Sequence, residues 1–159
     1  MQALVFFFNE LGIDLTRFDL AQGDHGRFVL VVAVQVHLRR GALLHDIGKP
    51  ATRRHEVDGG VSFHHHEVVG AKMTRKRMRA LKYSKQMIDD VSQLVYLHLR
   101  FHGYGDGRWT DSAVRRYVTD AGPLLARLHR LVRADCTTRN KRRAARLQAN
   151  YDELEHRIA

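Results

Sequence analysis

Apolar side chains recur at helical spacing along most of this chain, in successive stretches that begin after a capping residue and end at glycine or proline. Between residues 64 and 83 the apolar positions fall near helical spacing, with basic residues between them. Ser84 can cap the next helix, whose apolar stripe includes Val91 and Leu94. Strand signals are scarce over this part of the chain, so the pattern predicts an all-α fold.

The same pattern continues after a glycine-rich segment, residues 103–107, that is typical of a loop. Thr110 can cap a shorter helix, which Gly122 and Pro123 should end. Pro123 suits the first turn of a further helix, and we expect the chain to continue helically to its C-terminus. The exception is the stretch 28–36, whose valines favour a strand.

Composition limits the classes of protein to consider. The 159 residues fit one ordinary domain, and 27 Lys and Arg against 17 Asp and Glu leave a formal charge of +10. This charge favours polyanionic partners, although a solvated basic surface is the alternative. The single cysteine, Cys136, excludes an internal disulfide and a zinc site built from several thiolates. No apolar stretch approaches the ~20 residues that span a bilayer, so we expect no membrane partner and a cytoplasmic location.

The most informative run is LLHDIGKPATRR, residues 43–54. Its two leucines predict the end of a buried helix just before His45 and Asp46, and the glycine and proline that follow should stop that helix. Adjacent helical residues lie about 100° apart, so this imidazole and carboxylate can converge on one ion. Such ligands suit a divalent metal, and Lys49 would lie beside it as a phosphate-neutralising group.

Further ligands have to come from later in the chain. The helix expected at residue 64 begins with three histidines and Glu67. His98 and His102 are four residues apart and therefore share a helix face. Asp135 follows the apolar face of a late helix, where a carboxylate needs a partner, and a cation is the most economical one. P-loop, zincin and G-x-S-x-G motifs are absent from the sequence.

Two clusters of basic residues form a second candidate site. Six basic residues and no acidic one lie between Lys72 and Lys82, and eight more lie between Arg127 and Arg146, opposed only by Asp135. A phosphate backbone is a sensible partner for such surfaces, and two solvated helix faces are the alternative. The residues that we expect to contact nucleic acid are Lys72, Arg75, Lys76, Arg77, Arg79, Arg139, Lys141, Arg142 and Arg143.

Together, His45, Asp46, His66, His98 and Asp135 resemble the HD superfamily of metal-dependent phosphohydrolases. More closely, the runs LLHDIGKPATRR, GGVSFHHHEVVGAKM, LVYLHLRFHGYGDGRWTDSAVRRYV and LVRADCTTRNKRR resemble the C-terminal body of actinobacterial CCA tRNA nucleotidyltransferases and poly(A) polymerases. The resemblance implies an HD-domain-like helical bundle over residues 41–159, with a basic C-terminal helix, after a divergent N-terminal segment, residues 1–40.

The resemblance also implies roles for individual residues. His45 and Asp46 would be paired ligands of a divalent metal (Mn, Ni, Co, Mg or Zn), and Asp135 would close the shell. His66 and His98 would complete a second metal position or bind phosphate, and with Lys49 they would form the catalytic group. His64 and His65 are expected at the surface.

Two departures from the family bear on function. The Gly-Ser and Asp-x-Asp motifs of a nucleotidyltransferase head are absent, so nucleotide addition is not expected from this chain alone. A separate nucleotidyltransferase head is a conceivable partner. The family's first histidine has no match: Phe18 stands near its place, and His25 and His37 are candidate substitutes at unsuitable spacing.

Two functions follow from the sequence. The first is a metal-dependent phosphohydrolase domain of a tRNA nucleotidyltransferase-like protein, which would act on phosphoesters, nucleotides or RNA ends. The second is a catalytically silent body that binds RNA, above all tRNA, or a truncated fragment of a CCA-adding enzyme. Both predict RNA or nucleotide phosphates as partners.

Overall fold

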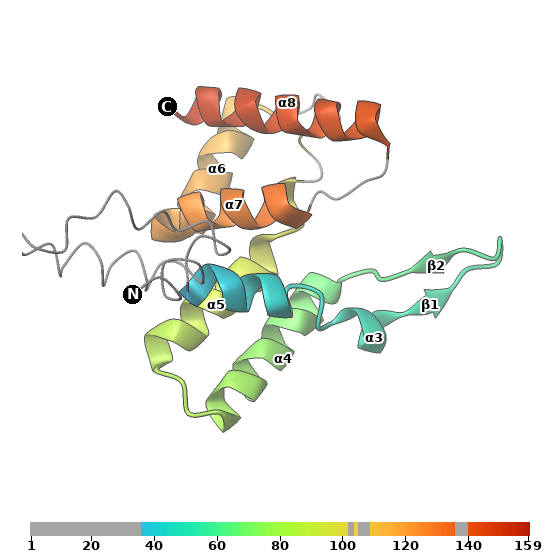
Figure 1. Ribbon diagram of the computed structural model, residues 1–159, viewed down its shortest axis with the longest axis vertical. Helices are drawn as coiled ribbons and strands as arrows, with labels where there is room; N and C mark the ends of the chain where they lie inside the picture. The colour runs from blue at the N-terminus through green and yellow to red at the C-terminus, as the bar shows by residue number, and fades with distance from the viewer. Residues whose placement is uncertain (1–35, 102–103, 105–108, 136–139) are drawn as a thin grey trace, which may run out of the picture. The chain divides into compact units, whose positions relative to one another are not determined.

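The computed structural model describes residues 36–101, 104, 109–135 and 140–159, and it divides the chain into two units, Met1–Val36 and His37–Ala159. The second unit is helical, which confirms the all-α prediction (Figure 1). A helix over 36–44 comes first. The later elements are α3 Lys49–Thr52, β1 Arg54–His55, β2 Val61–Ser62, α4 His66–Ala80, α5 Lys85–Leu97, α6 Asp111–Ala121, the 3-10 turn η4 Gly122–Leu124, α7 Leu125–Asp135 and α8 Lys141–Ile158.

The expected capping residues set the helix boundaries. The Ser84 hydroxyl accepts a hydrogen bond from the backbone N–H of Met87 at the start of α5, and Thr110 does the same for Ala113 at the start of α6. Helix α6 ends where Gly122 adopts a φ of +49°, a left-handed value that favours glycine. Pro123 then lies in the first turn of η4, where its missing N–H costs nothing.

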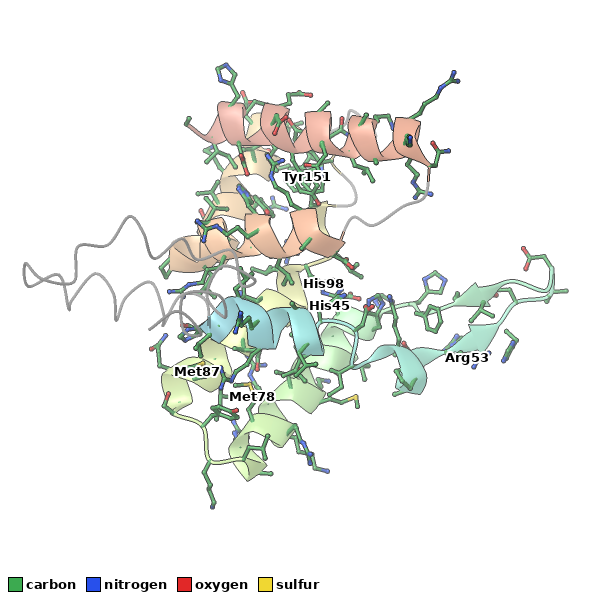
Figure 2. All side chains as sticks on the ribbon, viewed as in Figure 1. His45, Arg53, Met78, Met87, His98 and Tyr151 are labelled. Atoms are coloured by element: carbon green, nitrogen blue, oxygen red, sulfur yellow. The ribbon has the colours of Figure 1, made fainter. Side chains whose placement is uncertain are left out.

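Two apolar clusters hold the helices together. The larger draws on α5, α6, α7 and α8, and within it the rings of Phe101 and Tyr151 stack with centroids 3.6 Å apart. The smaller consists of Met78 from α4, which Figure 2 labels, with Ile88 and Val91 from α5. Each fully buried side chain of this kind stabilises the fold by roughly 1.5–3 kcal/mol.

A β-hairpin, which the sequence did not predict, interrupts the helices. We call residues 53–62 the arm. Its strands pair antiparallel, Arg54 with Ser62 and His55 with Val61, and the arm extends away from the helices (Figure 1). With two residues in each strand, the period-2 alternation that reveals a strand has no room to appear.

Two further expectations need correction. Leu43 is 80% exposed, so the helix over 36–44 does not end in a buried pair of leucines. Pro50 does not simply stop that helix, because it lies in the first turn of the new helix α3. Of the predicted strand 28–36, Val36 is helical and the rest lies outside the described residues, as do most of the predicted glycine loop and residues 136–139. None of the helices in the described part of the chain is long and apolar enough to cross a membrane.

Candidate metal centre

Four helix ends bring together the five residues singled out by the sequence. His45 and Asp46 lie in the turn after the first described helix, and His66 is the first residue of α4. His98 caps the C-terminus of α5, and Asp135 is the last residue of α7. We call these five residues the His–Asp cluster. Three of the four helix ends are C-terminal, and their partial negative charge favours a cation.

The side chains of the cluster approach one another closely. His45 Nε2 lies 3.1 Å from Asp135 Oδ1 and 3.3 Å from Asp46 Oδ2. His66 Nε2 lies 3.3 Å from the other oxygen of Asp46, Oδ1. The His98 ring has its centroid 5.3 Å from the rings of both His45 and His66. Asp46, His66 and His98 each offer one ligand atom, and these atoms all lie within 4.8 Å of one another. Figure 2 labels His45 and His98, which lie next to each other in this region.

The three imidazoles share one local arrangement. In each, Nδ1 lies within hydrogen-bond distance of the carbonyl oxygen of the residue three positions earlier. The pairs are His45 with Ala42 at 2.7 Å, His66 with Phe63 at 2.8 Å and His98 with Val95 at 2.6 Å. Because Nδ1–H donates to this carbonyl, Nε2 of the neutral ring carries the lone pair. The backbone therefore fixes both the tautomer and the ring orientation that a metal ligand needs.

A buried polar atom normally has a hydrogen-bond partner, but two ring nitrogens of the cluster have none among the described residues. Nε2 of His66 and Nε2 of His98 are buried without a hydrogen bond to any described residue. Each such atom costs roughly 1–3 kcal/mol. A lone pair on Nε2 of His45 would face two carboxylate oxygens, which is unfavourable unless positive charge lies between them. A divalent cation within reach of Asp46, His66 and His98 would satisfy the two buried Nε2 atoms, so this donor set fits a metal ion.

The surroundings shift the pKa values of two imidazoles in opposite directions. The hydrogen bond that the protonated His45 ring donates from Nε2 to Asp135 raises the pKa of His45 above its ordinary value, against the opposing effect of burial, so a metal ion bound at Nε2 has to displace this proton. Burial lowers the pKa of His98, so this ring stays neutral and can act as a ligand at neutral pH.

Lys49 lies at the rim of the cluster, on α3. Its Nζ is 2.6 Å from Asp46 Oδ2 and 5.9 Å from the centroid of the Phe63 ring. The side chain is 39% exposed, and its ammonium group is paired with the Asp46 carboxylate.

Gly48 is a structural requirement of the site that sequence reasoning took only for a helix stop. A Cβ at this position would lie 2.2 Å from the His66 carbonyl oxygen and 2.8 Å from the Gly70 nitrogen. The turn that carries His45 and Asp46 therefore rests directly on the backbone of α4, where only glycine fits.

The expected nucleic-acid contacts fall on two helices. Lys72, Lys76, Arg77 and Arg79 are exposed on α4, and Arg75 on the same helix is half-buried. Lys141, Arg142 and Arg143 are exposed in the first turn of α8, whereas Arg139 lies outside the described residues.

Acidic residues neutralise more of the second basic cluster, residues 127–146, than its sequence suggests. Arg133 pairs with Asp152 at 2.7 Å and with Glu155 at 3.0 Å, and Arg127 lies 3.6 Å from Asp90. Asp135 is the only acidic residue within this run of sequence, but acidic residues distant in the chain also fold back onto it.

The other histidines have different positions. His37 Nε2 lies 3.4 Å from Asp90, which is eight residues, or about 12 Å, before His98 along α5. His37 therefore does not replace the family's missing first histidine. His64 and His65 are exposed, as expected. His25, His102 and Phe18 lie outside the described residues.

Comparison with known proteins identifies similar chains. The model of the HD domain family matches residues 26–140. The CC-adding tRNA nucleotidyltransferase of Thermus thermophilus is 32% identical over 121 residues, which cover 73% of this chain and 26% of that protein. The A-adding tRNA nucleotidyltransferase of Deinococcus radiodurans is 36% identical over 99 residues, which cover 62% of this chain and 22% of that protein. The matched region thus spans about a quarter of the length of these relatives.

Proposed function

The chain belongs to the HD domain family, and on that premise we propose that it is a metal-dependent phosphohydrolase acting on phosphoesters of nucleotides or RNA ends. The observation that carries the proposal is the group of ligand atoms on Asp46, His66 and His98, which lie within 4.8 Å of one another beside the contacts of His45 with Asp46 and Asp135. Nε2 of His66 and Nε2 of His98 are buried without a hydrogen bond to a described residue. A divalent ion held there would supply a Lewis acid and lower the pKa of water.

Within this proposal, the chain's own residues have distinct roles. Asp46 presents one carboxylate oxygen to His45 and the other to His66, so it can belong to two ligand sets. One set is His45, Asp46 and Asp135, and the other is Asp46, His66 and His98. Lys49 neutralises the developing charge on the substrate phosphoryl group, because its ammonium lies at the rim and a phosphate can replace its carboxylate partner.

RNA is the substrate class that the surroundings favour. The relatives are tRNA nucleotidyltransferases, and the exposed cations of α4 and of the first turn of α8 suit a phosphate backbone. These same observations favour the second candidate, a catalytically silent body that binds tRNA and works with a nucleotidyltransferase head. The silent body needs no cation between the carboxylates, whereas the hydrolase does.

Metal analysis together with hydrolysis separates the two candidates. We expect the purified chain to retain a divalent metal and to release phosphate from terminal or cyclic nucleotide phosphates in Mn, Ni, Co or Mg. Asp46→Asn should lose both properties. The control is Asp89→Asn, which removes a surface carboxylate paired with Lys85 and should change neither. Metal retention with no hydrolysis of any substrate would refute the hydrolase and leave the silent RNA-binding body.

A further inference from the structure

Between Asp46 and His66, two neighbouring residues of the His–Asp cluster, the chain leaves the cluster and returns to it. We call the segment between them, which consists of α3 and the arm, the excursion. Asp46 and His66 have side-chain atoms 3.3 Å apart, yet α3 and the arm lie between them in the sequence. Helix α3 has no buried residue, and residues 53–61 are all exposed. A two-stranded hairpin of this kind is marginally stable alone, and closing the loop costs entropy. The excursion therefore adds almost nothing to the core, although it lies at the rim of the cluster.

Positive charge is concentrated where the arm leaves this rim. From residue 49 to residue 54 there are three cations, Lys49, Arg53 and Arg54, and no acidic residue. The sign reverses toward the tip, where Glu56 is hydrogen-bonded to Ser62 and Asp58 accepts the N–H of Gly60. A polyanion would therefore contact the base of the arm and avoid its tip.

The two arginines at the base of the arm are available to a ligand. Arg53 and Arg54 are exposed, and neither guanidinium makes a hydrogen bond or ion pair with the residues that the structure describes. Figure 2 shows the place of Arg53 in the arm. Arg133 and Arg157, by contrast, are both engaged by carboxylates. Arg53 has an extended backbone and Arg54 begins β1. Because adjacent residues of extended backbone point to opposite faces, the two guanidinium groups would reach different phosphates.

We propose that Arg53 and Arg54 bind the phosphodiester backbone of a single-stranded RNA end whose terminal phosphate occupies the His–Asp cluster. The proposal rests on the proposed hydrolase function and narrows its substrate to an oligonucleotide. A guanidinium group forms two parallel hydrogen bonds to a phosphate, so each arginine can hold one backbone phosphate while Lys49 binds the terminal one. A mononucleotide in the cluster has no backbone phosphate for the arm, so only a longer strand engages both places.

The test compares two pairs of adjacent exposed arginines in the full chain. The test variant is Arg53→Ala with Arg54→Ala, and the control is Arg115→Ala with Arg116→Ala on α6, which removes the same charge. We would measure the affinity for a labelled single-stranded RNA across a salt series. The slope of log affinity against log salt should become shallower by about 1.4 in the test variant, about 0.7 for each phosphate that an arginine no longer neutralises, and should stay unchanged in the control.

Kinetics supply the second readout. In the test variant, kcat/KM should fall about tenfold for the oligonucleotide through a higher KM and should stay unchanged for a mononucleotide. A third variant, Arg53→Lys with Arg54→Lys, keeps the charge and should restore most of the salt slope. Because the arm lies outside the core, both arm variants should retain the wild-type melting temperature, and so should the control, whose two arginines are exposed on α6.

The outcomes distinguish this proposal from the function on which it rests. An unchanged salt slope in the test variant, or an equal change in the control, overturns the arm proposal. If the test variant hydrolyses both substrates normally, the arm proposal fails and the hydrolase stands. If the wild-type chain hydrolyses neither substrate, the hydrolase fails, and so does the assignment of the terminal phosphate to the cluster.

Discussion

Replacing Gly48 by alanine should test the close approach on which the cluster is built. The backbone of Gly48 has φ −79° and ψ −18°, values that alanine adopts without strain. The penalty must therefore come from the new methyl group, which would lie 2.2 Å from the His66 carbonyl oxygen. To reach even 3.0 Å, the turn and α4 must separate by at least 0.8 Å.

Two opposing effects set the magnitude. Forcing a methyl group into a packed interface costs roughly 1–3 kcal/mol. Replacing glycine by alanine restricts the unfolded chain and returns roughly 0.4–1 kcal/mol. The two ranges leave a net decrease in the free energy of unfolding of about 0–2.6 kcal/mol, and the midpoint of about 1.3 kcal/mol corresponds to a decrease in Tm of roughly 3–5 °C for a chain of this size. Moving His66 away from Asp46 should also weaken metal binding, by about 10- to 100-fold if the effect resembles that of removing a residue that orients a ligand.

Urea denaturation and metal titration would measure the two effects separately. Gly60→Ala is the control, because a Cβ there would meet only the flexible side chain of Asp58. It should change the unfolding free energy by less than about 0.5 kcal/mol. If Gly48→Ala unfolds at the wild-type urea concentration and binds metal with unchanged affinity, the turn does not rest on α4 as described.

Three further predictions concern stability. Manganese at about 100 times its dissociation constant should raise the unfolding free energy by about 2.7 kcal/mol, and EDTA should reverse this; no metal-dependent change in a thermal melt would contradict a site in the folded state. Burial lowers the pKa of His129 below its ordinary 6.5, with Glu155 and Arg133 facing the ring. The folded state then binds fewer protons than the unfolded state, so stability should fall as the pH drops below about 6.5; His129→Gln should flatten this dependence in urea titrations from pH 7 to 5, and an identical slope would refute the assignment. Arg133→Met should cost roughly 0.4–2 kcal/mol in the same assay because it removes two ion pairs, to Glu155 and Asp152, that solvent partly screens, and a neutral effect would mean that these ion pairs contribute nothing.

Local signals in the sequence were sufficient to predict where the helices lie. The capping roles of Ser84 and Thr110 and the end of α6 at Gly122 depend on side chains and backbone within a few residues. Short-range signals of the same kind also made it possible to identify residues of the candidate site from the sequence. His45 and Asp46 are adjacent in the chain, and His66 and Asp135 lie near helix ends that the apolar pattern indicated. His98 does not follow this pattern, because α5 ends at Leu97, before the stretch on which His98 and His102 were expected to share a helix face. The structure brings these side chains together, and their roles as ligands remain a prediction.

Features that depend on distant parts of the chain could not be predicted. The pairing of Arg133 with α8 joins residues about 20 positions apart, and nothing in the sequence selects these acidic partners from the others. Gly48 could be identified as a helix stop, but its close approach to the His66 carbonyl becomes visible only when α4 is in place. The arm escaped prediction because its strands are too short for a periodic pattern and have no core to face.

The shared anchoring of the three imidazoles has a consequence for how such a centre can change. Each ring is held by the carbonyl of its own turn, three residues earlier, and none depends on another member of the cluster for its tautomer. One histidine can therefore be replaced by a cysteine or an acidic residue while the remaining imidazole rings keep their orientation. This modularity would allow metal preference to be retuned one donor at a time, from softer to harder ions, without refolding the scaffold.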